Sequence, residues 1–193
     1  MNNEKEYLML RDEITWKLKV IDTLGTFTYT IFISILGVAL STNVIELFLL
    51  PYIVIVPISL KVANHKYSIA YIASYLNKFL ENCNENKSFK WEKMHVKYYE
   101  INPRTIKEKI IYYGSSAEYI LMLILTTAIF WIKYFNQNEV EFSILQMHGY
   151  IFIQLFVIIF VIYISFSYMS YQRIKYTLAL KWDKVKENEG QDL

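Results

Sequence analysis

Four stretches of the chain are apolar, and charged segments separate them. The stretches cover residues 23–45, 47–62, 116–134 and 149–169. The first has no charged side chain from Thr23 to Ile45, which at about 1.5 Å per helical residue is long enough to cross about 30 Å of hydrocarbon. The fourth lies in an uncharged run from Phe142 to Gln172. We therefore predict an all-α protein, a four-span transmembrane helical bundle with helical cytosolic extensions.

The second stretch is the shortest of the four. Residues 47–60 alone lie between Glu46 and Lys61, and a straight crossing at about 1.5 Å per residue needs more. Pro51 and Pro57 predict a kinked crossing helix, in which the Lys61 side chain reaches the membrane surface. A re-entrant segment is the alternative.

Basic residues are distributed unevenly among the segments that flank these stretches. Of 20 Lys and Arg residues, all but Lys133 precede the first stretch, lie at the end of the second (Lys61), or follow the second or the fourth. Cytoplasmic loops retain an excess of Lys and Arg, so the pattern predicts that both termini and the central segment are cytosolic. It also supports a crossing by the second stretch, because otherwise the basic central segment would lie outside.

These patterns predict five segments. They are an amphipathic N-terminal helix (1–22), a first transmembrane hairpin (23–63), a cytosolic helical region (64–115), a second transmembrane hairpin (116–169) and a cytosolic C-terminal helix and tail (170–193). The tight connector after Ser41 accounts for the first hairpin. Helix from Pro103 is expected to run directly into the third span.

Outside the spans, apolar side chains recur at helical spacing in three places. In the N-terminal helix the spacing predicts a face that lies on the membrane surface or packs on a bundle. A similar face is expected near the end of the second span and in the C-terminal helix. The three faces are Leu10, Ile14, Leu18 and Ile21; Tyr67, Ala70, Tyr71, Ser74, Tyr75, Lys78 and Phe79; and Ile174, Leu178, Trp182 and Val185.

Few residues offer catalytic or metal chemistry. A net charge of +2 gives no global basic field, so nucleic acid is not an expected partner. His65, His95 and His148 fall on different segments without metal-ligand spacing, and no phosphate-binding loop is present. Cys83 is the single cysteine and excludes an intramolecular disulfide. We expect no enzyme activity, no metal and no cofactor.

A polar stripe follows one face of the first span, and its residues are candidates to line a pore. Its hydroxyl residues recur at helical spacing, and Gly37 lies on the same face, whereas Ile31 and Ile35 lie off it. Small and hydroxylated residues equally suit a close contact between helices, which is the alternative. The hydroxyl residues of the stripe are Thr23, Thr26, Thr30, Ser34 and Ser41.

Four other side chains are candidates for function. Glu118, in the third span, is either an intramembrane acid with a function or an interfacial carboxylate. Gln154, in the fourth, either bonds a neighbouring helix or lines a pore. Phe89 and Trp91 form a cytosolic aromatic cluster that either binds a protein or nucleotide or packs on the bundle.

The order of amphipathic helix, tight hairpin and cytosolic helix in residues 5–82 resembles the layout of SLATT-type membrane effectors of bacterial anti-phage systems. That resemblance implies a homo-oligomer that permeabilises the bacterial inner membrane when a sensor is triggered. It carries over no functional residue, because no motif is matched residue by residue.

We therefore expect a homo-oligomeric channel or pore-forming effector in the bacterial inner membrane. Its expected partners are membrane lipid, copies of itself, and a cytosolic sensor protein or nucleotide signal. The alternatives are a non-conducting scaffold or accessory subunit, and a small transporter whose Pro51 and Pro57 would break one helix.

Overall fold

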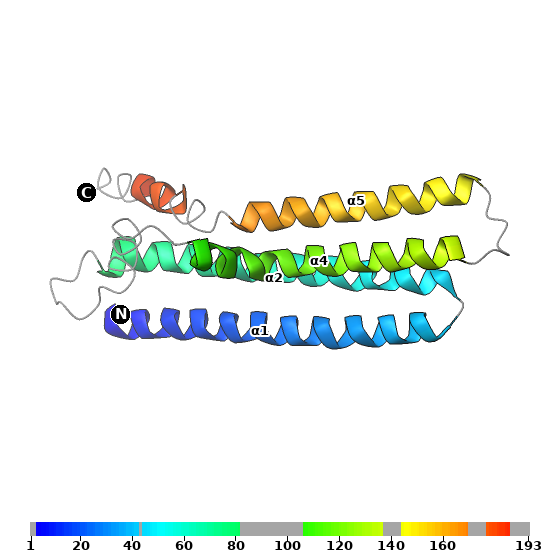
Figure 1. Ribbon diagram of the computed structural model, residues 1–193. Coiled ribbons are helices and arrows are strands. Elements are labelled where there is room, and N and C mark those ends of the chain that lie inside the picture. The colour runs from blue at the N-terminus through cyan, green and yellow to red at the C-terminus, as the bar shows by residue number, and fades with distance from the viewer. Residues whose placement is uncertain (1–2, 43, 82–105, 137–143, 170–176, 186–193) are drawn as a thin grey trace. The chain divides into compact units, whose positions relative to one another are not determined.

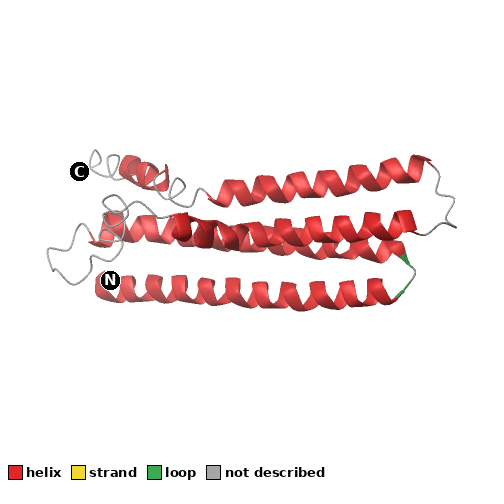
Figure 2. Ribbon diagram, viewed as in Figure 1, coloured by secondary structure: helices red, strands yellow, loops and turns green. Residues whose placement is uncertain are grey.

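The computed structural model describes most of the chain, and every regular element in the described part is helical. It leaves undescribed residues 1–2, 43, 82–105, 137–143, 170–176 and 186–193. No strand occurs among the described residues, so the predicted all-α class is confirmed for them (Figure 2). The candidate interaction residues Phe89 and Trp91, and also Cys83 and His95, lie outside the described part.

The helices are long (Figure 1). In chain order they are α1 (Asn3–Ser41), the 3₁₀ helix η1 (Ile45–Leu49), α2 (Leu50–Tyr75), the π-helix η2 (Leu76–Glu81), α4 (Ile106–Asn136) and α5 (Ile144–Met169). Residues 177–185 are also helical.

Four helices among the described residues are long and apolar enough to cross a membrane. They are Glu4–Ser41, Ile45–Leu80, Ala117–Asn136 and Met147–Ser165. In the first of these, the predicted N-terminal helix and the predicted first span form one uninterrupted helix. No proline occurs in α1, so nothing removes a backbone hydrogen bond between the two segments.

The chain divides into two compact units. Unit 1 comprises residues 1–21, 64–112 and 168–193, and unit 2 comprises residues 22–63 and 113–167. The boundaries fall inside α1, α2, α4 and α5, so single helices contribute to both units. Unit 2 holds the apolar stretches, whereas most of the charged residues belong to unit 1.

The second apolar stretch forms a continuous helix. Pro51 lies in the first turn of α2, where a missing backbone N–H costs no hydrogen bond. Pro57 lies inside α2, yet the helix continues to Tyr75, and η2 extends it to Glu81. The predicted continuation of this helix beyond the span is confirmed. A helix of this length favours the crossing over the re-entrant alternative, and it lacks the break expected of a transporter helix.

Unit 2 is held together by contacts at several levels along its helices. At one end, Ala39, Ile45, Phe48 and Phe130 form a buried cluster that joins α1, η1 and α4. Further along α2, the buried Tyr52 hydroxyl donates to the Leu123 carbonyl at 3.4 Å and also contacts the Thr127 hydroxyl. Polar and apolar contacts therefore both fix α4 against the first hairpin.

Unit 1 buries the predicted face of the N-terminal helix. Tyr7 and Ile14 are buried against the last turns of α2 and η2, and Leu10 and Ile21 pack at the edge of the same cluster. This packing supports the bundle alternative over a helix on the membrane surface. Leu18, which was predicted to share the face, is instead exposed. The partner residues are Ile69, Ile72, Ala73, Leu76 and Leu80.

Candidate functional site

The predicted polar stripe lies on an outward surface of unit 2. Its hydroxyl residues are all exposed. Three of them bond along their own helix: Thr26 donates to the Asp22 carbonyl at 3.1 Å, Thr30 to the Thr26 carbonyl at 3.0 Å, and Ser34 to the Thr30 carbonyl at 2.8 Å. Ser41 likewise donates to the Val38 carbonyl at 2.9 Å. The other helices in the described part of the chain therefore do not cover this stripe.

The opposite face of α1 supplies the contacts within the chain. Thr28, Phe32 and Ala39 are buried, whereas Gly37 on the stripe is exposed. A methyl group added at Gly37 would meet no atom within 4 Å. Glycine inside a helix costs roughly 0.5–1 kcal/mol relative to alanine. Since the chain's own packing does not require Gly37, its presence suits a close approach from outside the protomer.

A shallow groove borders the stripe. It has a volume of about 280 Å³ and is lined almost entirely by apolar atoms of Ser34, Ile35, Val38, Leu47 and Leu50. It lies where α1, η1 and the start of α2 meet. The groove and the stripe together make an indented surface with a polar margin.

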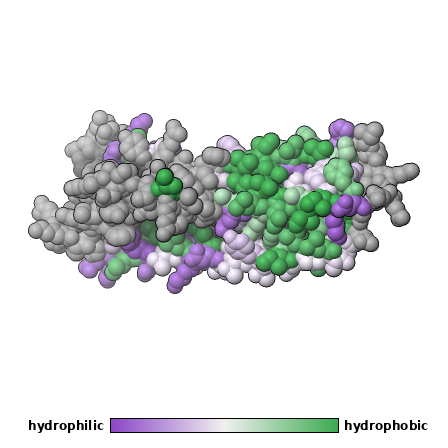
Figure 3. Space-filling view, viewed as in Figure 1, coloured by the Kyte–Doolittle hydropathy of each residue, from purple (hydrophilic) through white to green (hydrophobic). Residues whose placement is uncertain are grey.

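The outward face of α5 is hydrophobic, unlike the polar stripe on α1. Phe152, Phe156, Ile159 and Tyr163 recur at helical spacing and are more than half exposed. The rings of Phe152 and Phe156 stack along the helix with centroids 6.4 Å apart. Figure 3 shows hydrophobic side chains gathered over α4 and α5. In a membrane such a face suits acyl chains, whereas the stripe on α1 does not.

Glu118 lies at the edge of the polar stripe on α1. The Tyr29 hydroxyl donates to Glu118 Oε2 at 2.6 Å, which joins α1 to α4. Tyr29 is 42% exposed and Glu118 is half-buried, so the pair lies at the surface of unit 2 and not in its centre. The sequence identified Glu118 but gave no indication of its phenol partner.

Gln154 joins two helices. Its side chain is buried, and the Trp131 indole N–H donates to its Oε1 at 2.8 Å. Its Nε2 is buried and has no hydrogen-bond partner among the described residues. The structure therefore supports the helix–helix bond predicted as one of the two roles for this amide, and it places Gln154 away from the stripe.

Lys133 caps the end of α1. Its Nζ donates to the carbonyls of Ala39 at 3.2 Å, Leu40 at 3.0 Å and Thr42 at 2.8 Å. These carbonyls lie at a helix C-terminus, where partial negative charge accumulates and a cation is favourable. The last turn of α1 has no basic residue of its own, so α4 supplies the cation. Sequence reasoning located Lys133 but did not predict this role.

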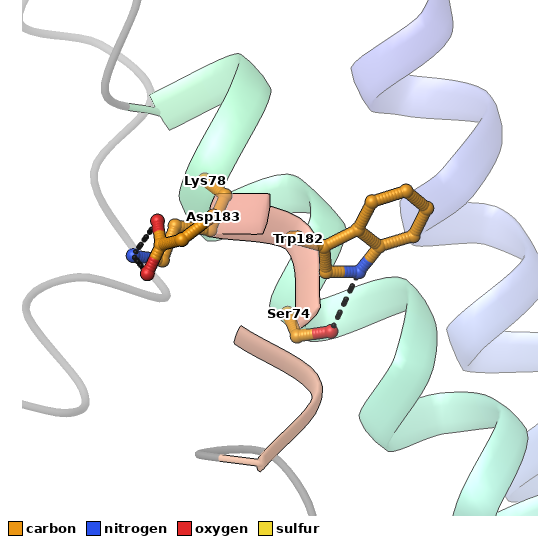
Figure 4. Close-up of polar contacts among 4 residues, drawn as sticks. All are labelled: Ser74, Lys78, Trp182 and Asp183. Carbon is orange, nitrogen blue, oxygen red and sulfur yellow. Dashed lines mark hydrogen bonds and ion pairs between the residues drawn. The ribbon is translucent and has the colours of Figure 1, made fainter. Parts of the chain in front are cut away.

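The C-terminal helix docks on the end of α2 in unit 1 (Figure 4). The Trp182 indole N–H donates to Ser74 Oγ at 3.2 Å, and its ring lies 5.1–5.5 Å from those of Tyr71, Tyr75 and Phe79. The next residue, Asp183, accepts from Lys78 Nζ at 2.6 and 2.7 Å.

Both predicted faces contribute to this contact. Leu178 is buried, and the face of α2 and η2 that was predicted from Tyr67 to Phe79 meets Trp182 through Tyr71 and Phe79. Val185, the last residue of the predicted seam, is exposed, and Ile174 lies outside the described part. Lys78 belongs to the π-helix η2. Such turns are rare in proteins, and those that occur are often found at functional sites.

Trp182→Ala is expected to loosen this contact. It removes one hydrogen bond and three ring contacts, so amide hydrogen exchange in residues 177–185 should accelerate roughly tenfold. Lys78→Met should accelerate it less, because Lys78 and Asp183 are partly exposed and such pairs contribute about 0–1 kcal/mol. The control is Trp16→Ala, which truncates an exposed tryptophan of α1. Equal exchange in the Trp182 and Trp16 variants would contradict the docking contact.

Metal chemistry finds no support in the described residues, because no group of three His, Cys, Asp or Glu side chains there is placed to hold an ion. Comparison with known proteins adds no family: no family model, no curated protein and no solved structure matches the chain. The argument for function therefore depends on the arrangement of the helices and their surfaces.

Proposed function

We propose that the protein is a homo-oligomeric membrane channel or pore-forming effector in which the stripe on α1 lines a shared path. The observation that carries the proposal is the contrast between two outward faces of unit 2. On α1 the exposed residues include the polar or small Thr26, Thr30, Ser34 and Gly37 beside the apolar Phe27, Ile33 and Val38, whereas on α5 they are mainly aromatic and aliphatic. Hydroxyl side chains tolerate water in a path, whereas the α5 face suits lipid.

Several copies of the chain are needed for conduction. The stripe lies on the outside of one protomer, so the protomer alone encloses no water along it. Copies that place α1 towards a common axis would bring the stripes together and leave α5 facing lipid. A closed cyclic assembly satisfies this requirement, because every copy then turns the same surface towards the axis.

The proposed location is the bacterial inner membrane, with multiple spans and with both termini in the cytoplasm. The uneven distribution of Lys and Arg supports this orientation. Unit 1, with the docked C-terminal helix, would then lie on the cytosolic side and receive a signal from a sensor protein or a nucleotide. A role in anti-phage defence follows from the resemblance in layout to SLATT-type effectors.

A non-conducting scaffold or accessory subunit is the second candidate, and one observation favours it. The hydroxyls of Thr26, Thr30 and Ser34 already bond to backbone carbonyls of α1, so they need neither water nor an ion. A stripe satisfied in this way can pack dry against a second helix. The two functions agree on assembly and differ on whether ions pass.

The test combines mass with ion flux. The purified chain in nanodiscs is expected to be a closed oligomer of several copies, and in liposomes it should release a potassium gradient. Empty liposomes and liposomes with an unrelated four-span protein are the controls. A monomer in nanodiscs would exclude the proposal. An oligomer that releases no gradient would favour the scaffold.

A further inference from the structure

We infer that the path is selective for cations and that Glu118 holds the cation at one of its ends. This inference rests on the proposed function, because a selectivity site has meaning only if ions pass. It goes beyond that function by naming the charge of the permeating ion and the group that selects it. The ligand class is a monovalent metal cation, which carboxylate and hydroxyl oxygens bind without a dedicated cage.

The position of Glu118 supports this assignment. Tyr29, whose hydroxyl donates to Glu118 Oε2 at 2.6 Å, is three residues after Thr26 on α1, and residues three apart are neighbours on a helix surface. The carboxylate therefore lies beside the stripe and at the surface of unit 2. Tyr29 orients one carboxylate oxygen through a neutral phenol, which leaves the negative charge of Glu118 uncompensated by that contact.

The described bases of unit 2 do not neutralise this carboxylate. Lys133 donates to three carbonyls at the end of α1. Lys61 is exposed on α2, and no ion pair joins it to Glu118 among the described residues. An acidic side chain in a membrane span is costly, so one without an ion pair among the described residues is a candidate for an ion pathway.

The assembly multiplies this charge. Each copy contributes one Glu118, so a closed oligomer with α1 towards its axis carries a ring of carboxylates near one end of the path. Rings of Asp or Glu side chains select cations over anions in channels. Even in bulk water, two unit charges 4 Å apart interact by about 1 kcal/mol, which corresponds to an about fivefold preference.

Reversal potentials in planar bilayers under a potassium chloride gradient test the inference. The wild-type chain should prefer potassium over chloride at least about fivefold, and Glu118→Gln should reduce the preference to near one. Glu118→Asp keeps the charge and should keep the preference. The matched control is Glu13→Gln, which removes an exposed carboxylate, paired with Lys17, from unit 1 and should not change the preference.

The outcomes separate this inference from the function on which it rests. Conduction without cation preference, or equal preference in the wild type and Glu118→Gln, overturns the cation site and leaves the channel. An absence of conduction by the wild type removes the channel and the site together. If Glu118→Gln does not assemble, the potassium preference of Glu118→Asp is compared with that of Glu13→Gln and of the wild type. Equal loss of preference in Glu118→Asp and Glu13→Gln would show no specific role for Glu118.

Discussion

A chain that carries Thr30→Leu together with Ser34→Leu is expected to lose roughly nine-tenths or more of its ion flux while it still assembles. The two side chains occupy neighbouring turns of the stripe on α1, and both are exposed. Leucine there would form a ring of apolar groups in the oligomer. A hydrophobic constriction of this kind excludes water, and ions cannot pass without it.

Expression and fold should survive this double substitution. Thr30 and Ser34 make their hydrogen bonds to carbonyls of their own helix, and these carbonyls keep their helical bonds without the hydroxyls. Leucine also has a higher helix propensity than either residue. The readout is potassium release from liposomes that contain equal masses of protein.

The matched control replaces Ile31 and Ile35 by leucine on the adjacent face of α1. Both are half-buried, and the exchange conserves volume, so flux should remain within about twofold of the wild type. Equal flux from the Thr30/Ser34 variant and from this control would show that the stripe is a packing surface. Loss of flux in both would show that α1 tolerates no change, which also contradicts the specific role of the stripe.

Lys133→Met should destabilise unit 2 by about 2 kcal/mol, because hydrogen bonds to a charged donor contribute about 1.5–3 kcal/mol. The variant keeps the length of the side chain and removes the ammonium from the carbonyls of Ala39, Leu40 and Thr42. These carbonyls close α1 just before the connector to η1. Loss of helix during a detergent titration is the measurement.

Lys61→Met is the control for this prediction. Lys61 is exposed near the other end of unit 2, and substitutions at exposed sites usually change stability by about 0.5 kcal/mol or less. Equal effects of the two substitutions would contradict the capping role. On the proposed topology, Lys133 is also the single basic residue outside the cytosol, and its use as a cap gives a reason for its retention there.

The sequence predicted which face of a helix is buried more reliably than which residues that face contacts. The period of the N-terminal helix correctly placed Leu10, Ile14 and Ile21 towards a bundle. It also included Leu18, one turn beyond Ile14, which is exposed and lies outside the cluster. Helical spacing defines a direction, and the width of the contact depends on the helix that packs there.

The stripe on α1 also shows that helical spacing alone does not determine what a helix face contacts. Its spacing was read from the sequence, but small residues at helical spacing suit either an internal or an external contact. Only the packing of Thr28, Phe32 and Ala39 shows that the stripe faces away from the protomer. The choice between the two depends on contacts between segments far apart in the chain.

The capping role of Lys133 was not predicted, although one signal was present. The last turn of α1 holds no basic residue, and the connector contains no glycine that would end the helix with its usual backbone bonds. A helix end without its own cap needs an outside donor. Which donor reaches it depends on the position of α4, which no local pattern fixes. The same holds for the contact of Trp182 with Ser74.

The most direct test of the central claim is the accessibility of the stripe to water in the assembled protein. Single cysteines at Thr26, Thr30 and Ser34, in a Cys83→Ser background, would be treated in liposomes with a charged thiol reagent. Phe152→Cys and Phe156→Cys are the controls, since both native side chains are more than half exposed in the protomer but lie on α5. Thiols react as thiolates, which require water, so a shared aqueous path predicts labelling of the three stripe positions at least about tenfold faster than of the controls. Slow labelling at all five positions would contradict the account and would mean that a second helix packs dry against α1.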